Sequence, residues 1–146
     1  KGTLRLLSME KIPAPRTMAE FFGFAEEETV MLFRRLRTVD GVPYSYIMNY
    51  LPLSTAAKVS IEDLNELNMA TIFEKSLGAS LEKIIQAIEA RSADSEIAAQ
   101  LSIDIASPVM YVETFIRIDN EVPAEFSRSF YRGDRYKYLV ERTSKR

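Results

Sequence analysis

The sequence predicts an α+β domain in which an antiparallel β-sheet carries a few short helices and is built from two pseudo-symmetric halves. Runs of alternating apolar and polar residues are typical of half-buried strands, and short segments with apolar residues at helical spacing separate them. The chain also resembles itself. Met18–Phe24 and Val30–Asp40 recur as Ile97–Ile103 and Val109–Asp119 at one offset, since 97 − 18 and 109 − 30 both equal 79.

The composition is that of a single folded domain. The chain has 146 residues, of which 47% are hydrophobic and 27% charged, and it has neither cysteine nor histidine. Disulfides, thiolate nucleophiles, imidazole bases and the usual zinc sites are therefore excluded, and we expect no cofactor. The net charge of −2 argues against nucleic-acid binding by this chain alone. No apolar run approaches the ~20 residues of a membrane span, so we expect a cytoplasmic protein with no membrane partner.

The first half begins with a strand that is under way by Leu4. A short helix follows, because apolar residues recur at helical spacing in Met18, Phe21 and Phe22. The next two runs, Val30–Asp40 and Val42–Leu51, predict a long hairpin. Its turn is Asp40-Gly41, since glycine takes the positive φ that hairpin turns require and aspartate tolerates it.

The segment that joins the two halves, Ser54–Gly78, is predicted to be helical. One apolar pattern is Ile61, Leu64 and Leu67, and a second is Ile72, Phe73 and Leu77. Ser60 and Thr71 are candidate N-caps, and Gly78 is a candidate stop.

In the second half, Val122-Pro123 matches Val42-Pro43 at an offset of 80, after one extra residue at the turn. Any two hairpins with Val-Pro after the turn would look alike, which is the alternative explanation. The shared spacing of helix, strand and turn favours a duplication.

The first hairpin carries two arginines that the second lacks. Arg35 and Arg37 lie on one strand face, while their counterparts are Thr114 and Ile116. Two guanidinium groups roughly 6 to 7 Å apart repel each other unless an anion lies near both. A phosphate or carboxylate from outside the protein would serve, because guanidinium groups bind such groups bidentately.

The alternatives for these arginines are exposure to water at a sheet edge or pairing with an internal glutamate, Glu113 or Glu125. Two neighbouring faces bear on the choice. One is a row of mostly aromatic side chains on the strand that follows the turn, which is either part of the core or part of an interface. It consists of Tyr44, Tyr46, Met48 and Tyr50. The other is the polar face of the last strand in the second hairpin, which either lines a pocket or faces solvent. It consists of Glu125, Ser127, Ser129 and Tyr131.

Four motifs together resemble the UTRA domain over about Arg5 to Arg142. They are Phe130–Tyr138 (FYRGDRYKY), Arg35-Leu-Arg37, Asp40-Gly-Val-Pro43 and Tyr50-Leu-Pro52. This family comprises the effector-binding domains of HutC-type, GntR-family bacterial transcription regulators. The resemblance implies a chorismate lyase-like fold, a homodimer, and DNA binding only through an N-terminal winged helix-turn-helix domain. Residues 1–146 then form the effector-binding domain, and this chain lacks the DNA-binding one.

The resemblance also implies a site for a small anionic metabolite, a phosphosugar or a carboxylate. Arg35, Arg37 and the Thr71 hydroxyl would hold its acidic group, and a helix start at Thr71 would independently attract an anion. Glu125 and Tyr131 would contact its polar body, with Ser127 on the same face. Several family members have glutamate where this chain has Ile47, which favours a more apolar effector.

Two other functions are compatible with the sequence. One is a chorismate lyase-like enzyme, with Glu125 as an acid, although the absence of histidine and cysteine and the motif match argue against it. The other is a dimerisation module without a ligand. Arg132, Asp134 and Arg135 are interpreted as a salt-bridged corner after Gly133 rather than as ligand contacts.

Overall fold

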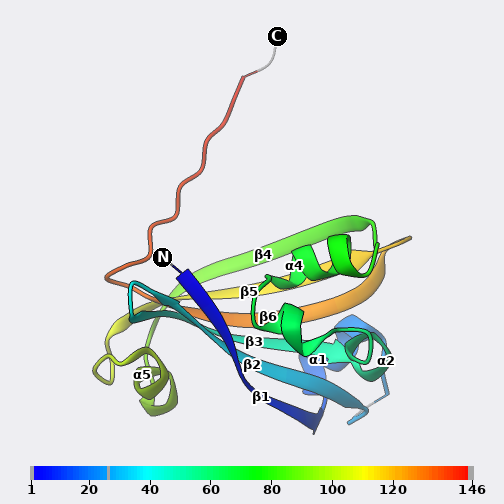
Figure 1. Cartoon of the computed structure of the whole chain (residues 1–146), viewed down its shortest axis with the longest axis horizontal. Coiled ribbons are helices and arrows are strands. Elements are labelled where there is room, and N and C mark those ends of the chain that lie inside the picture. Colours follow the sequence, from blue (N-terminus) through cyan, green and yellow to red (C-terminus); the bar gives the residue numbers. More distant parts are fainter. Residues whose placement is uncertain (1, 26, 145–146) are drawn as a thin grey trace.

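The computed structural model describes residues 2–25 and 27–144. Six strands form one antiparallel sheet in the order β1-β2-β3-β6-β5-β4 (Figure 1). Their bounds are β1 (Gly2–Pro13), β2 (Thr29–Val39), β3 (Val42–Pro52), β4 (Leu81–Ser92), β5 (Pro108–Ile118) and β6 (Val122–Arg132). The predicted α+β class, an antiparallel sheet with short helices, is confirmed.

The helices are all short. They are α1 (Arg16–Phe22), α2 (Leu53–Ala56), α3 (Ile61–Leu64), α4 (Met69–Thr71), the π-helical turn η1 (Ile72–Ser76) and α5 (Ser95–Leu101). Ser60 caps α3 as predicted, since its hydroxyl accepts the Asp63 N–H at 3.1 Å. The prediction of Thr71 as an N-cap is wrong. Asn68 caps α4 instead, because its side-chain oxygen accepts the Thr71 N–H at 2.8 Å and asparagine is the stronger cap.

The sheet is pseudo-symmetric about its two central strands. The strand order pairs β1 with β4, β2 with β5 and β3 with β6 around a pseudo-twofold axis. Met48 on β3 lies directly opposite Arg128 on β6, and 128 − 48 equals 80, the offset of the sequence match. The axis therefore passes between two residues that correspond to each other, which confirms the two predicted halves.

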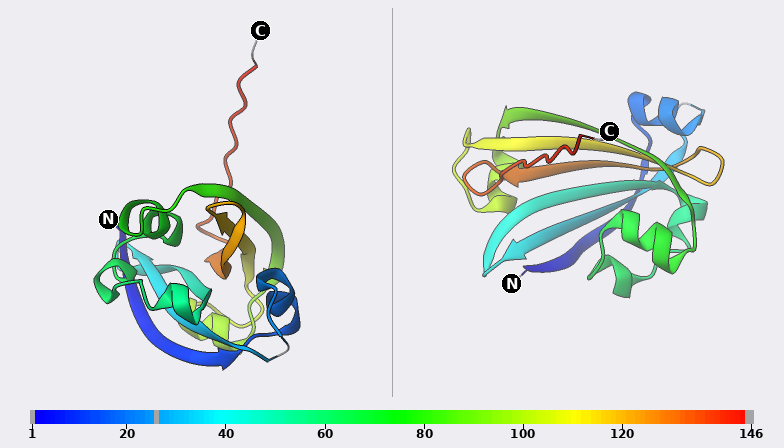
Figure 2. Two further views of the ribbon diagram at one scale, coloured as in Figure 1. Left: turned by 90° about the vertical axis from the view of Figure 1, so that its right-hand side faces the viewer. Right: turned by 90° about the horizontal axis from the view of Figure 1, so that it is seen from above.

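Helices cover both faces of the curved sheet (Figure 2), and a hydrophobic core lies beneath them on each face. The first core packs α1 and α5 against one face and contains Tyr46 and Tyr50, so these members of the aromatic row are core residues. The second core packs the segment from α2 to η1 against the other face and contains Phe33, Ile72 and Phe73. Strands β1, β2, β3, β5 and β6 each contribute side chains to both cores, because side chains alternate between the faces of a strand.

The corner after β6 is structural, as interpreted from the sequence. Arg132 binds Asp134 through two hydrogen bonds of 3.1 and 2.9 Å, and the Gly133 N–H donates to the Pro108 carbonyl at 3.0 Å. A Cβ atom on Gly133 would lie 2.4 Å from that carbonyl oxygen, so only glycine allows this close approach. Arg135 joins the corner through its backbone N–H, which donates to the Arg132 carbonyl.

Within residues 2–25 and 27–144, no helix is long and apolar enough to cross a membrane. In the same residues, no group of three or more acidic, histidine or cysteine side chains is placed to hold a metal ion.

Candidate functional site

A cavity of about 270 Å³ lies on the sheet face that carries the second core, where the sheet meets the start of α4. Six of the seven residues predicted for the site line it, namely Arg35, Arg37, Ile47, Glu125, Ser127 and Tyr131. Their convergence follows from the register. Ile47 lies opposite Arg35 on one side and Ser129 on the other, and residues paired across antiparallel strands share a face.

Thr71 is the predicted residue that does not line the cavity. The chain just before it does, through Asn68, Met69 and Ala70. Because α4 begins at Met69 rather than at Thr71, the first turn of this helix reaches the cavity with earlier residues. The sequence therefore located the helix start near the site but placed it too late. A ligand contact through the Thr71 hydroxyl stays a prediction.

Arg35 is buried and bound by the protein itself. Its side chain is 1% exposed; Nε donates to Asn49 Oδ1 at 2.9 Å, and one terminal nitrogen donates to the Leu64 and Leu67 carbonyls at 3.1 and 2.7 Å. Burial lowers the pKa of Arg35 to about 10, with the charge of Arg37 acting in the same direction and that of Glu125 opposing it. Arg35 thus stays charged at neutral pH and holds the segment between α3 and α4 against the sheet.

Arg37 is in a different situation, although it lies on the same strand face. It is half-buried and lines the cavity. Among the described residues, no side chain or carbonyl forms a hydrogen bond or ion pair with its guanidinium group. Arg37 lies opposite Ser45, which lies opposite Tyr131 on β6. A cation at a cavity wall without an internal counter-ion is suited to bind an external anion.

Asn49 links Glu125 to Arg35 through hydrogen bonds to both. Asn49 accepts from Arg35 with its oxygen and donates its amide to Glu125 Oε2 at 2.6 Å. Burial raises the pKa of Glu125 to about 7, although the Asn49 hydrogen bond and the charge of Arg35 lower it. The carboxyl is therefore partly protonated at neutral pH. Glu113, the other internal partner considered for the arginines, lines a cavity on the opposite face of the sheet.

The sequence analysis missed Asn49, which is the most buried of the unpredicted lining residues, and it also missed Asn68, Ile84 and Gln86. Strand alternation places Asn49 on the face of Ile47, and it is 2% exposed. A buried amide must find hydrogen-bond partners, so a polar residue at an inward position was the available signal.

The remaining cavity lining is mixed in character. Apolar groups come from Ile47, Met69, Ile84 and Ile116, and hydroxyl or amide groups come from Gln86, Thr114, Ser127 and Ser129. Such a lining fits a small ligand with one acidic group and a body that is partly apolar.

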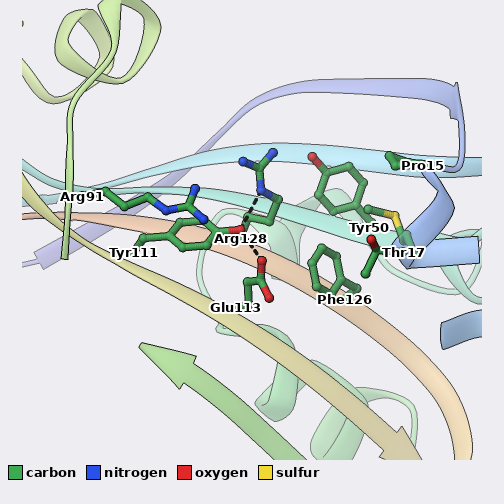
Figure 3. Close-up of a pocket in the computed structure, with 9 residues that line it drawn as sticks. Pro15, Thr17, Tyr50, Arg91, Tyr111, Glu113, Phe126 and Arg128 are labelled. Carbon is green, nitrogen blue, oxygen red and sulfur yellow. Dashed lines mark hydrogen bonds between the residues drawn. The ribbon is translucent and has the colours of Figure 1, made fainter. Parts of the chain in front are cut away.

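A second cavity, of about 260 Å³, lies on the opposite face of the sheet (Figure 3). Its polar groups already bind each other: Arg128 Nε donates to the Tyr111 hydroxyl at 2.9 Å, and that hydroxyl donates to Glu113 at 2.8 Å. The guanidinium group of Arg91 lies 3.7 Å from the centre of the Tyr111 ring. Because these groups satisfy one another, the first cavity is the better candidate for a ligand.

Comparison with known protein families assigns the domain to a family. The chain belongs to the UTRA domain family, whose model matches residues 1–137. The probable transcriptional regulator PhnF of Escherichia coli is 30% identical over 138 residues, which cover 94% of this chain and 56% of the relative. The transcriptional repressor NagR of Bacillus subtilis is 22% identical, with 92% and 55% covered. This chain spans about half the length of these relatives.

Solved structures show the same fold. The effector domain of PhnF from Mycobacterium smegmatis superimposes with a TM-score of 0.87 at 23% identity, covering 99% of this chain and 88% of that one. A transcriptional regulator from Streptomyces coelicolor gives a TM-score of 0.84 at 28% identity, with 97% and 96% covered. The chorismate lyase-like architecture expected from the resemblance is confirmed.

Proposed function

We propose that this chain is the effector-binding domain of a HutC-type, GntR-family transcription regulator, and that a small anionic metabolite binds in the cavity beside Arg37. DNA binding belongs to an N-terminal domain of the full-length regulator. Such a regulator acts in the cytoplasm. The family membership and the regulators among the relatives support this role.

The observation that carries the proposal is the contrast between the two arginines. The protein uses Arg35 for its own hydrogen bonds, whereas Arg37 lines the cavity without an internal anion among the described residues. Two positive charges on one strand face repel each other, and an external anion beside Arg37 offsets that repulsion. The first turn of α4 lies across the same cavity and favours negative charge as well.

The residues that line the cavity also restrict the chemical class of the effector. A phosphate or carboxylate group would bind Arg37, and the rest of the ligand would lie against Ile47 and Ile116 and reach Ser127 and Tyr131. Ile47 offers no hydrogen bond, so a densely hydroxylated body gains little on that side. Phosphorylated or carboxylated metabolites with a short, partly apolar body are the class that fits.

The segment between α3 and α4 offers a route by which ligand binding could regulate the protein, because its end lines the cavity. Arg35 fixes the chain between α3 and α4 through the Leu64 and Leu67 carbonyls, while Asn68 to Ala70 face the ligand. A ligand that contacts this segment favours the conformation in which the segment is held most closely. That differential affinity shifts the population of states that the DNA-binding domains sense.

Thermal denaturation with a panel of sugar phosphates, phosphonates and small carboxylic acids tests the proposal. A ligand that binds only the folded state raises the melting temperature in proportion to the logarithm of its concentration. We expect at least one acid to do so for the wild-type chain, and Arg37→Ala to abolish the shift. Arg117→Ala removes an arginine that does not line this cavity, so it is the matched control and should respond like the wild type.

Each alternative function gives a different result. A dimerisation module without a ligand would show no shift with any acid in the panel. A chorismate lyase-like enzyme would convert chorismate to 4-hydroxybenzoate with repeated turnover. Either result would contradict the proposal, and so would a shift that Arg37→Ala leaves unchanged.

A further inference from the structure

The sheet face that carries the first core holds the second cavity, of about 260 Å³, next to the start of α1 (Figure 3). Four buried and mostly aromatic side chains line it: Met18, Tyr50, Tyr111 and Phe126. Its polar side chains include Arg91, which is exposed, and Arg128 and Glu113, which are half-buried. A concave site with apolar walls and a few polar groups is the usual form of a small-molecule site.

The polar groups of this cavity are peculiar to the second half of the chain. Arg91, Tyr111 and Arg128 stand where the first half has Ile12, Leu32 and Met48, because 91 − 12 and 111 − 32 equal 79 and 128 − 48 equals 80. Leu32 and Met48 are buried in the first core. The scaffold therefore folds with apolar side chains at these positions, and the second half departs from that pattern. Such departures are expected at functional sites.

A short side chain on α1 leaves this space open. In the first half, Glu96 on α5 extends to the sheet and accepts a hydrogen bond from the Tyr46 hydroxyl at 3.1 Å. The matching residues of the second half are Thr17 on α1 and Phe126 on β6, because 96 − 17 equals 79 and 126 − 46 equals 80. Both of these residues line the cavity. The cavity therefore lies where the other half of the domain places a carboxylate of its own.

Arg128 is the cation that a ligand would meet in this space. Its Nε donates to the Tyr111 hydroxyl, which donates to Glu113, so a tyrosine separates this guanidinium group from the carboxylate opposite it in the sheet. The Tyr50 hydroxyl is its other polar neighbour. Among the described residues, Arg128 forms no ion pair. Its terminal nitrogens point away from Tyr111 (Figure 3), and such a pair of nitrogens binds a carboxylate bidentately.

The other charges around the cavity favour a ligand with one negative charge. The guanidinium group of Arg91 lies over the Tyr111 ring, and its Nε donates to Glu89. Two arginines are therefore accompanied by two carboxylates, those of Glu89 and Glu113. A single external carboxylate adds one negative charge beside Arg128, whereas a dianionic phosphate adds a second charge that Glu113 repels.

We propose that this cavity is a second binding site, for a monocarboxylic acid with a flat aromatic body. The carboxylate binds the terminal nitrogens of Arg128, and the ring packs against Tyr50 and Phe126, where aromatic groups add favourable ring contacts. The site lies on the opposite face of the sheet from the cavity beside Arg37, so the two sites can be occupied together. The inference goes beyond the proposed function and does not depend on it, because the two sites use different arginines.

Calorimetric titration with 2-naphthoate, which has a rigid bicyclic ring and one carboxylate, tests this site. Every protein in the test carries Arg37→Ala, so that the effector cavity lacks its acid-binding cation. We expect this background protein to bind one equivalent with a dissociation constant of about 1 mM or below. Adding Arg128→Met should weaken binding about tenfold or more, because it removes the charge that pairs with the carboxylate. Methionine is the residue that the first half buries at this position, so the variant should fold.

Thr17→Glu is a second variant, which fills the cavity instead of removing its cation. It gives α1 the carboxylate that α5 has at the matching position, and it should weaken binding about tenfold or more as well. Arg5→Ala, at an exposed position of β1, makes the same change in net charge as either variant and is the matched control. It should bind 2-naphthoate like the background protein.

The head group of the ligand is tested with 2-naphthyl phosphate at pH 8, where a phosphate monoester is dianionic because its second pKa is about 6. This compound should bind the background protein about tenfold or more weakly than 2-naphthoate does. No binding of 2-naphthoate to the background protein would overturn the inference, as would binding to Arg128→Met and Thr17→Glu that is no weaker than binding to Arg5→Ala. A phosphate that bound as tightly as the carboxylate would overturn the ligand class.

Discussion

At the scale of single residues, two arginines with the same orientation have different roles because their neighbours differ. Arg35 is near the middle of the hairpin, where the α3–α4 segment brings two carbonyl oxygens to it. Arg37 is one pleat closer to the turn, beyond the reach of those carbonyls, and lies opposite Ser45 and next to the cavity. The same residue type therefore supports the fold at one position and remains available for a ligand at the other.

Alanine substitution should separate the two roles. Arg35→Ala leaves the Leu64 and Leu67 carbonyls and Asn49 without a buried donor, and should lower the free energy of unfolding by about 3 kcal/mol or more. Arg37→Ala removes a cation with no internal partner in the described structure and should change that free energy by less than about 0.5 kcal/mol. Urea denaturation measures both. Equal losses would contradict the division of roles.

Glu125 should make the stability of the domain depend on pH. Its pKa is raised from the ordinary value of 4.5 to about 7 by burial, so the folded protein binds this proton more tightly than the unfolded chain does. The stabilisation is therefore complete below pH 4.5 and is lost as the pH rises to about 7, by up to about 3 kcal/mol.

Urea denaturation of the wild type and of Glu125→Gln at several pH values isolates this contribution. The glutamine cannot titrate, so the difference in unfolding free energy between the two proteins should favour the wild type most at low pH and then level off above pH 7. A difference that is constant with pH would show that the folded state does not raise this pKa.

The sequence predicted the residues on each strand face but not their partners. Alternation put Arg35 and Arg37 on one strand face and Glu125 and Tyr131 together on the face of another strand, and the family resemblance implied that both face one ligand. It could not reveal that Arg35 is bound by Leu64 and Leu67, because those contacts depend on where a distant helical segment packs. The pairing of Arg35 with an internal glutamate was close to the observed arrangement, in which Asn49 lies between Arg35 and Glu125.

At the scale of elements, the start of α4 combines a structural and a functional task. Asn68 caps the helix and also lines the cavity, whereas Ser60 caps α3 away from it. The sequence predicted both helices, and it identified Ser60 but not Asn68 as a cap. Both Asn68 and Thr71 are suitable cap residues, and the helix begins after the stronger one, asparagine.

The two caps offer a matched pair of variants. Asn68→Ala and Ser60→Ala should each lower the free energy of unfolding by about 1 kcal/mol, because each leaves a helix N–H without its side-chain acceptor. Only Asn68→Ala should also weaken binding of the acid found in the denaturation panel, as measured by calorimetric titration. If Ser60→Ala weakened binding as much, the start of α4 would have no specific role in the site.

At the scale of the whole molecule, the pseudo-symmetry concerns the backbone more than the chemistry. The two halves place equivalent strands at the centre of the sheet, yet the first half supplies Arg35 and Arg37 to the cavity and the second supplies Thr114 and Ile116 at the matching positions. The acidic group of the proposed ligand would therefore lie towards the first half. The edges differ in the same way, because β1 is covered and β4 is not.

The shared sheet also predicts how the domain unfolds. Leu101 of α5 is fully buried in the first core, and Ile72 of η1 is fully buried in the second. The strands between them contribute side chains to both cores, so neither core keeps its partner surface when the other is lost. We expect a single cooperative transition, in which Leu101→Ala and Ile72→Ala each lower the unfolding free energy by about 2 to 5 kcal/mol.

Scanning calorimetry at a fixed protein concentration measures this, because the van't Hoff and calorimetric enthalpies agree for a two-state transition of a defined assembly. Both variants should move the same peak to lower temperature without splitting it. If Ile72→Ala produced an early transition and left the α5 side of the sheet to melt at the wild-type temperature, the cores would be independent. The segment at the cavity could then open without unfolding the rest, and the ligand would act on a local equilibrium rather than on the whole sheet.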